Sequence, residues 1–191
     1  MVLGSTTYLD YAKNDYDFFR SAYDSGNKGS ALASNGHDIC EHYLKHIITE
    51  YAEPENDQEQ FKKERALRTH NLHILIRYLR DDMGISVPEE TEDKLDKING
   101  FYFSTRYPGD DSFIASERDV DKASDAVESA RKFTLEVCRE KETNQTANWF
   151  LKTNRAGAMS EYRQGSGFLV YPADSWQKKN GQNSGFRVVP V

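Results

Sequence analysis

The sequence predicts an all-α protein, an antiparallel up-and-down bundle of four to five helices with a small C-terminal β-hairpin extension. Apolar residues recur at helical spacing in most of the chain up to residue 142. All five prolines fall between these periodic segments or in the tail, where they separate the expected elements. From residue 156 onward the helical period is lost, and the last 36 residues contain five glycines.

The first two helices are expected at residues 7–24 and 30–52. In the first, aromatic and alanine side chains fall near one face, and the polar stretch SGNKGS follows it as a turn. The acidic stretch EPENDQEQ after the second helix favours a loop. The apolar stripe of the second helix consists of Ile39, Tyr43, Ile47 and Tyr51.

A third helix is expected to contain residues 64–79 and to stop near Gly84, since glycine commonly follows a helix end. A short fourth helix, residues 90–105, ends before Pro108, and a fifth covers residues 119–142. The inward face of the third helix is marked by Leu72, Leu75, Ile76 and Leu79. The buried face of the fifth is marked by Val120, Ala123, Val127, Ala130, Phe133 and Val137.

Residues 7–142 are therefore the predicted helical bundle, and residues 143–191 are an extension with a short helix and two short strands. The strands are expected within SGFLVYP and SGFRVVP, at residues 166–172 and 184–190, with KKNGQN between them. Because two strands alone are marginally stable in water, we expect them to pack on the helices or on another chain.

Composition and charge are those of a soluble globular protein, and we expect a cytoplasmic one. Charged residues make up 29% and hydrophobic residues 37% of the chain. No apolar run approaches the roughly 20 residues of a membrane span, and no signal peptide is visible, so no membrane association is expected. Cys40 and Cys138 fall in helical patterns and are expected to be reduced. The net charge of −6 disfavours non-specific nucleic-acid binding, so any RNA contact requires a local basic patch.

Arg65 and His70, spaced Arg-x-x-x-x-His, are the candidate catalytic residues. Metal-free RNA cleavage needs a group that moves the 2′-hydroxyl proton and a cation that stabilises the phosphate, and histidine and arginine suit these two tasks. On a regular helix the two side chains would point about 140° apart. The spacing alone favours a solvated arginine and a capping histidine. The pair could still meet if a helix begins between them with Thr69 as N-cap, or across a dimer axis.

Three further residues, His73, Arg77 and Arg106, are candidate phosphate or nucleotide ligands. On a regular helix His70, His73 and Arg77 lie within about 60° of one another, opposite the apolar stripe. This basic ridge is interpreted either as a phosphate site or dimer contact, or as an ordinary polar outer face. Arg106 precedes a Tyr-Pro-Gly turn and could add a second cation to a phosphate site.

No metal site and no cofactor are expected. His42 and His46 lie one helical turn apart, a spacing that can chelate a metal, and Asp38 extends the row. No further ligand is evident, and the pattern is typical of a polar helix edge. The sequence also lacks a Walker loop and the GxGxxG and GxSxG motifs.

Four stretches of the sequence, taken in this order, resemble the HEPN domain family. YAKNDYDFFRSAY resembles the first helix of the family, and HDICEHYLKHII resembles the second, with Glu41 and Lys45 as its Glu-x-x-x-Lys pair. RTHNLHILIRYL resembles the Thr-His-x-Leu start of the third helix. STRYPGDD resembles the Arg-Tyr-Pro element before the last helix. The resemblance covers about residues 7–142.

The resemblance implies a homodimer in which the outer faces of central helices meet. Many members are RNases with an Arg-x(4–6)-His motif at the dimer cleft, often toxins paired with a separate nucleotidyltransferase antitoxin. By this comparison His70 and Arg65 match the catalytic motif, and Arg106 matches the Arg-Tyr-Pro element. Two hypotheses stay open: a metal-independent endoribonuclease that acts on RNA at a homodimer cleft, and a non-catalytic dimeric module that binds a nucleotide or a protein.

Overall fold

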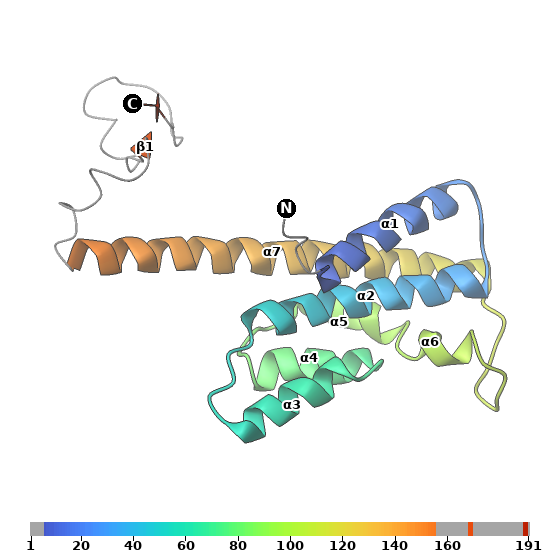
Figure 1. Ribbon diagram of the computed structural model, residues 1–191. Coiled ribbons are helices and arrows are strands. Elements are labelled where there is room, and N and C mark those ends of the chain that lie inside the picture. Colours follow the sequence, from blue (N-terminus) through green and yellow to red (C-terminus); the bar gives the residue numbers. More distant parts are fainter. Residues whose placement is uncertain (1–5, 156–167, 170–188, 191) are drawn as a thin grey trace. The chain divides into compact units, whose positions relative to one another are not determined.

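The computed structural model describes residues 6–155, 168–169 and 189–190 (Figure 1). The chain divides into two compact units, with the boundary between Glu142 and Thr143. The helices, in chain order, are α1 (Tyr8–Asp24), α2 (Ser30–Tyr51), α3 (Asp57–Leu67), α4 (Leu72–Asp81), α5 (Glu89–Asp96), α6 (Phe101–Ser104) and α7 (Glu117–Arg155). Two short strands, β1 (Phe168–Leu169) and β2 (Val189–Pro190), follow them. The all-α prediction for residues 7–142 is confirmed.

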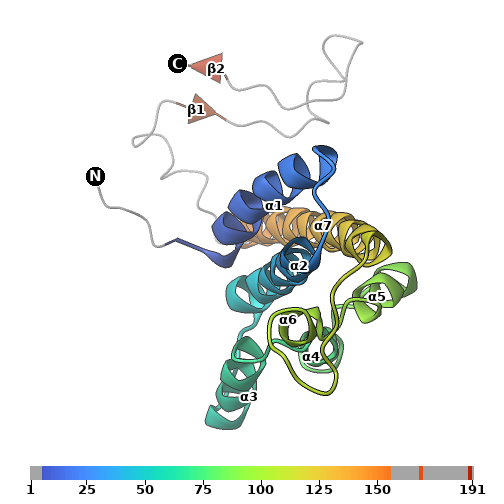
Figure 2. The same ribbon diagram turned by 90° about the vertical axis from the view of Figure 1, so that its right-hand side faces the viewer.

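Helix α2 lies at the centre of the first unit, with α1 and α7 on one side and α4 and α6 on the other (Figure 2). Fourteen of its 22 residues are buried, so its polar side chains as well as its apolar ones lie inside the protein. Of the predicted stripe, Ile39, Tyr43 and Ile47 are buried in the core and Tyr51 is half-buried. The central position of α2 therefore places polar residues in the interior, where each needs a partner.

Helices α2 and α7 approach each other closely at Gly36. A Cβ atom added to Gly36 would lie 2.9 Å from the Cβ of Ala123 on α7 and 3.1 Å from the ring of Phe19 on α1. Any larger residue at position 36 would separate these three helices. Glycine at this position therefore allows α2 to pack closely against α1 and α7.

The strictly alternating up-and-down order is only partly confirmed. Helices α1 and α7 are antiparallel, since Tyr16 donates a hydrogen bond to Glu128 and Tyr23 donates one to Asp121. Helices α2 and α7 run in the same direction (Figure 1). The reason is that α3 to α6 return the chain to the start of α2, where the amide of Ala115 donates to the Ser30 hydroxyl at 2.9 Å.

Two of the predicted helices are interrupted. The expected helix containing residues 64–79 is divided into α3 and α4, and residues 57–60, which were expected in the loop EPENDQEQ, belong to α3. The side chains of Asn56 and Asn71 accept hydrogen bonds from the first turns of α3 and α4, so each begins at an N-cap. The expected helix at residues 90–105 is divided into α5 and α6 before Gly100, whose φ of +94° is incompatible with a continuous helix.

The last predicted helix is longer than expected, because α7 continues from Glu117 to Arg155. In the C-terminal unit, β1 and β2 pair antiparallel with Phe168 opposite Pro190. The residues between these strands lie outside the described part of the chain, so the hairpin connection stays a prediction. Over the described residues, none of the helices combines the length and apolar character required to cross a bilayer.

Candidate active site

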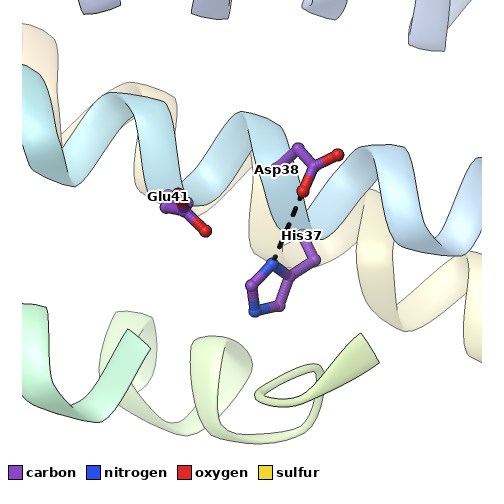
Figure 3. A group of neighbouring side chains, drawn as sticks. All are labelled: His37, Asp38 and Glu41. Atoms are coloured by element: carbon purple, nitrogen blue, oxygen red, sulfur yellow. Dashed lines mark ion pairs between the residues drawn. The ribbon is translucent and has the colours of Figure 1, made fainter. Parts of the chain in front are cut away.

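The candidate site begins with a row of polar residues on the buried side of α2. His37, Glu41 and Lys45 are spaced four residues apart, which places them one above another on one face of the helix. His37 is fully buried, and Glu41 and Lys45 are each only 4% exposed. Figure 3 shows His37 and Glu41 projecting from the same side of α2, with the Asp38 carboxylate beside the His37 ring.

Glu41 contacts both Lys45 on its own helix and His70 before α4. One carboxylate oxygen accepts a hydrogen bond from the Lys45 ammonium at 2.7 Å, and the other lies 2.9 Å from Nδ1 of His70. Both oxygens of Glu41 are therefore occupied by nitrogen partners, as a buried carboxylate requires. Glu41 and Lys45 neutralise each other, and the remaining lone pairs of Glu41 orient the histidine.

His70 lies on the short linker between α3 and α4, where Tyr102 and Glu41 hold its ring. Asn71 is the N-cap of α4, whereas the hydroxyl of Thr69, the cap considered as one alternative from sequence, accepts from the Asn71 amide at 3.1 Å. The His70 ring stacks on Tyr102 of α6, with centroids 4.1 Å apart and planes within 5°. Glu41 holds Nδ1 from the other helix. A histidine fixed on a rigid scaffold in this way has a single orientation.

This arrangement leaves His70 able to exchange protons. An ionised Glu41 can only accept, so in the neutral imidazole the contact with Glu41 favours the proton on Nδ1 and leaves the lone pair on Nε2. Within the described residues Nε2 has no hydrogen-bond partner, and the side chain is 37% exposed. The carboxylate–histidine pair thus presents a base to solvent, with the partner charge that would stabilise the imidazolium formed on proton transfer.

Arg106 enters the same site from the end of α6. Its guanidinium donates to the Asp38 carboxylate at 2.5 Å and lies over the Tyr102 ring, 4.6 Å from the centroid. Tyr102 therefore contacts both His70 and Arg106. Burial raises the pKa of Asp38, and the nearby Arg106 charge opposes that effect. The Arg106 side chain remains 37% exposed, so a cation faces solvent near the histidine.

His37 lies on the buried side of the site, with its ring 6.2 Å from that of Tyr102. Neither ring nitrogen makes a hydrogen bond within the described part of the chain, although the Asp38 carboxylate lies 4.0 Å from Nδ1. Burial lowers the pKa of His37 to about 4, while the charge of Glu41 acts in the opposite direction. His37 is therefore neutral at physiological pH, and it is a polar group without a compensating bond in a buried position.

The side chains of His37, Asp38 and Glu41 offer three donor atoms within 4.8 Å of one another, a grouping that could hold a metal ion. Both carboxylates, however, already have cationic partners, Arg106 and Lys45. A divalent ion would have to displace these partners, so the grouping fits an internal charge network better than a metal centre.

The histidine row considered from sequence does not assemble. His42 lies near the rings of Tyr8 and Tyr11, whereas His46 is buried near Tyr51. Asp38, the third member of that row, turns instead to Arg106.

The basic ridge expected on the third helix is not formed, because His70 and His73 face different elements. His70 precedes α4 and turns to α2, whereas Nε2 of His73 pairs with Asp96 at the end of α5. The Nδ1 atom of His73 also contacts the Asn99 amide at 3.2 Å. Arg77 is exposed on α4 and makes no hydrogen bond or ion pair among the described residues. Of the three expected phosphate ligands, only Arg106 lies in the network around His70.

Arg65 and His70 are not in contact within the chain. Arg65 is exposed in the last turn of α3 and has no hydrogen-bond or ion-pair partner in the described part of the chain. The side chain is therefore available to bind an anion or a second molecule.

Sequence reasoning did not identify His37 or Tyr102 as members of the site. The spacing of His37, four residues before Glu41, was a usable signal, because it places both on one helical face. For Tyr102 no sequence signal existed, since its stacking on His70 joins residues 32 positions apart only in the folded chain.

Comparison with known proteins agrees with this architecture. A family model described as HEPN domain matches residues 6–141, well over half of the chain. Searches of curated proteins and of solved structures found no match. The match covers α1 to α6 and most of α7, including every residue of the network around His70. The chain therefore belongs to the HEPN domain family.

Proposed function

We propose that this protein is a metal-independent endoribonuclease in which His70 transfers the proton. The observation that supports this most is the hydrogen bond between Glu41 and Nδ1 of His70, in a side chain that is still partly exposed. A buried carboxylate is costly to keep, and one of the two Glu41 oxygens is directed at the His70 ring. The pairing has the arrangement of a base and its orienting group.

In the proposed reaction Nε2 of His70 accepts the proton of a ribose 2′-hydroxyl. The 2′-oxygen then forms a bond to the adjacent phosphorus as the bond from phosphorus to the 5′-oxygen breaks. The 5′-oxygen takes a proton from water, and the imidazolium returns its proton to solvent. The products are a 2′,3′-cyclic phosphate and a 5′-hydroxyl. Arg106, beside His70, would stabilise the negative charge on the phosphate oxygens.

Arg65 is proposed as a phosphate ligand supplied across a homodimer. Among the described residues of one chain it makes no hydrogen bond or ion pair with His70, and its exposed position at the end of α3 leaves it free to approach the site of a second copy. As an RNase toxin, the chain would be paired with a separate nucleotidyltransferase antitoxin. His73 has a weaker case as a ligand, since Asp96 and Asn99 already bind its ring.

A specific observation favours a second candidate, a non-catalytic dimeric module that binds a nucleotide or a protein. Asp38 neutralises Arg106, so the cation nearest to His70 carries little net charge toward an RNA phosphate. The chain as a whole is also acidic, with a net charge of −6. Such a module would bind its ligand without turnover.

The decisive experiment measures cleavage of a mixed RNA pool in the presence of EDTA by the wild type, His70→Ala and His73→Ala. The two histidines lie three residues apart, but His73 points to α5 and serves as the matched control. We expect cleavage by the wild type and His73→Ala, and a loss of 100-fold or more in His70→Ala, about the range for general acid–base catalysis. Full activity in a folded His70→Ala variant would refute the proposal. No cleavage by the wild type would favour the binding module.

A further inference from the structure

An exposed aromatic surface adjoins His70 and is not used by the proposed proton transfer. We define this surface as Tyr102, Phe103 and Tyr107, on α6 and the turn that follows it. Phe103 and Tyr107 are 54% and 56% exposed, although large apolar side chains tend to be covered. A cluster of rings at this exposure, concentrated in six residues of chain, indicates a surface that contacts another molecule.

The rings are ordered by contacts with one another and with the catalytic candidate. The Tyr102 and Phe103 centroids lie 4.7 Å apart with planes at 83°, and Phe103 lies 6.2 Å from Tyr107. Phe103 also meets the edge of the His70 ring at 5.7 Å. The aromatic surface thus adjoins the base that would remove the 2′-hydroxyl proton.

The backbone holds this surface in place. The amide of Phe113 donates to the carbonyl of Ser104 at 2.9 Å, which closes the loop after α6 back onto the helix. The hydroxyl groups of Ser104 and Thr105 bond to carbonyls one turn earlier. The rings are therefore presented on a fixed support, and little conformational entropy would be lost when a flat ligand binds.

The chemistry beside the rings favours a nucleobase over a second copy of this chain. A base that stacks on Phe103 would place its ribose and phosphate near His70 and Arg106, one a base and the other a cation. Asp110 and Asp111 are exposed just after Tyr107. Burying these carboxylates against protein would be costly, whereas a single base stacked on Phe103 leaves them in water.

We propose that the aromatic surface binds an unpaired nucleobase next to the scissile phosphate, with Phe103 as the principal stacking residue. This inference rests on the proposed RNase function and specifies its substrate class as single-stranded RNA. Bases within a duplex are already stacked on their neighbours and cannot reach the ring faces without unpairing. Duplex RNA is accordingly a poor ligand.

The test measures binding, not cleavage, so that it stays informative if the RNase proposal fails. A short 2′-O-methyl oligonucleotide, which has no 2′-hydroxyl to react, carries a fluorescent 2-aminopurine whose emission falls on stacking. Wild-type protein is titrated into this oligonucleotide and into its duplex. Phe103→Ala, Phe103→Tyr and Phe18→Ala are measured alongside, and Phe18, 65% exposed on α1, is the matched control. Light scattering records the size of each variant.

We expect the wild type and Phe18→Ala to bind and quench the single strand, and to bind the duplex at least tenfold more weakly. Phe103→Ala should bind the single strand roughly 5- to 150-fold more weakly, from the free energy of base–aromatic stacking. Phe103→Tyr should bind the single strand as tightly as the wild type does, because it keeps the aromatic ring.

Three outcomes would overturn the inference: no binding of the single strand by the wild type, equal binding by Phe103→Ala, or dissociation of a dimer in Phe103→Ala. The last would show that the rings contact a second copy. Binding without any RNA cleavage would refute the RNase proposal alone. Cleavage with no effect of Phe103→Ala on binding would refute the stacking inference alone.

Discussion

Replacing Glu41 by glutamine should separate the stability of the site from its chemistry. Glutamine keeps the shape of the side chain but removes its charge, so Lys45, which is buried, loses its ionic partner. Leaving one member of a buried ion pair without its counter-charge typically costs about 3–5 kcal/mol. This is a large part of the roughly 5–15 kcal/mol that stabilises a domain. Glu41→Gln should therefore be severely destabilised.

A second substitution recovers the fold without recovering the proposed activity. In Glu41→Gln/Lys45→Met both charges are absent and an apolar chain of similar length fills the space of lysine. Replacing a buried ion pair by apolar groups is often neutral or stabilising, so the double variant should be more stable than Glu41→Gln. His70 would still lack its carboxylate, so RNA cleavage should stay at least about 100-fold below that of the wild type.

The coupling free energy between Glu41 and Lys45 is measured by urea denaturation of the wild type, the two single variants and the double variant. RNA cleavage in EDTA is assayed on the same preparations. Lys45→Met alone should lose less stability than Glu41→Gln, since Glu41 keeps His70 as a partner. A double variant whose destabilisation equals the sum of the two single effects would refute the ion-pair argument. A stable double variant with wild-type cleavage would refute the role of Glu41 in orienting His70.

Two further predictions concern the packing and the titration of α2. Gly36→Ala should lower the free energy of unfolding by about 1–3 kcal/mol, because its new methyl group would overlap Ala123. Gly109→Ala is the control and should change stability little, because the space around Gly109 is open. Equal effects of the two substitutions in urea denaturation would contradict the close approach of the helices. The pKa of His37 in the folded chain, about 4, lies below its ordinary value of 6.5, so the unfolded chain takes up the proton first. The free energy of unfolding should therefore be unaffected by His37 titration above pH 6.5 and should fall by up to about 3 kcal/mol as the pH drops to 4. Denaturation series over this range should show a flatter dependence in His37→Leu, and identical curves for the two proteins would exclude His37 as the source.

The helical pattern predicted the buried faces better than the breaks between helices. The stripe of Leu72, Leu75, Ile76 and Leu79 is buried as expected, because the period of apolar residues reflects which face the core covers. The same stripe did not show that the helix begins only at Leu72. Neither proline nor glycine marks residues 64–71, and the break depends on the N-cap Asn71, whose residue type is also common inside loops.

Single residues of the candidate site could be selected from the sequence, but the contacts between them could not. His70 and Arg106 could be selected because their chemistry suits RNA cleavage and because of the family resemblance. That Glu41 reaches His70 depends on how α2 packs against the linker before α4, a tertiary contact across 29 positions. The helical period likewise placed His73 beside His70, and the packing of α5 placed them apart. Local periodicity does not contain this information.

The buried pair of Glu41 and Lys45 also constrains how this protein can change over evolutionary time. Loss of either residue alone would leave an unpaired charge in the interior and destabilise the fold, whereas replacing both by apolar residues would cost less stability. A lineage in which the proposed RNase activity was no longer selected would therefore pass through a less stable variant before it reached an apolar replacement. This less stable intermediate delays the loss of the pair, so both residues would remain in such a lineage after the proposed activity had ended.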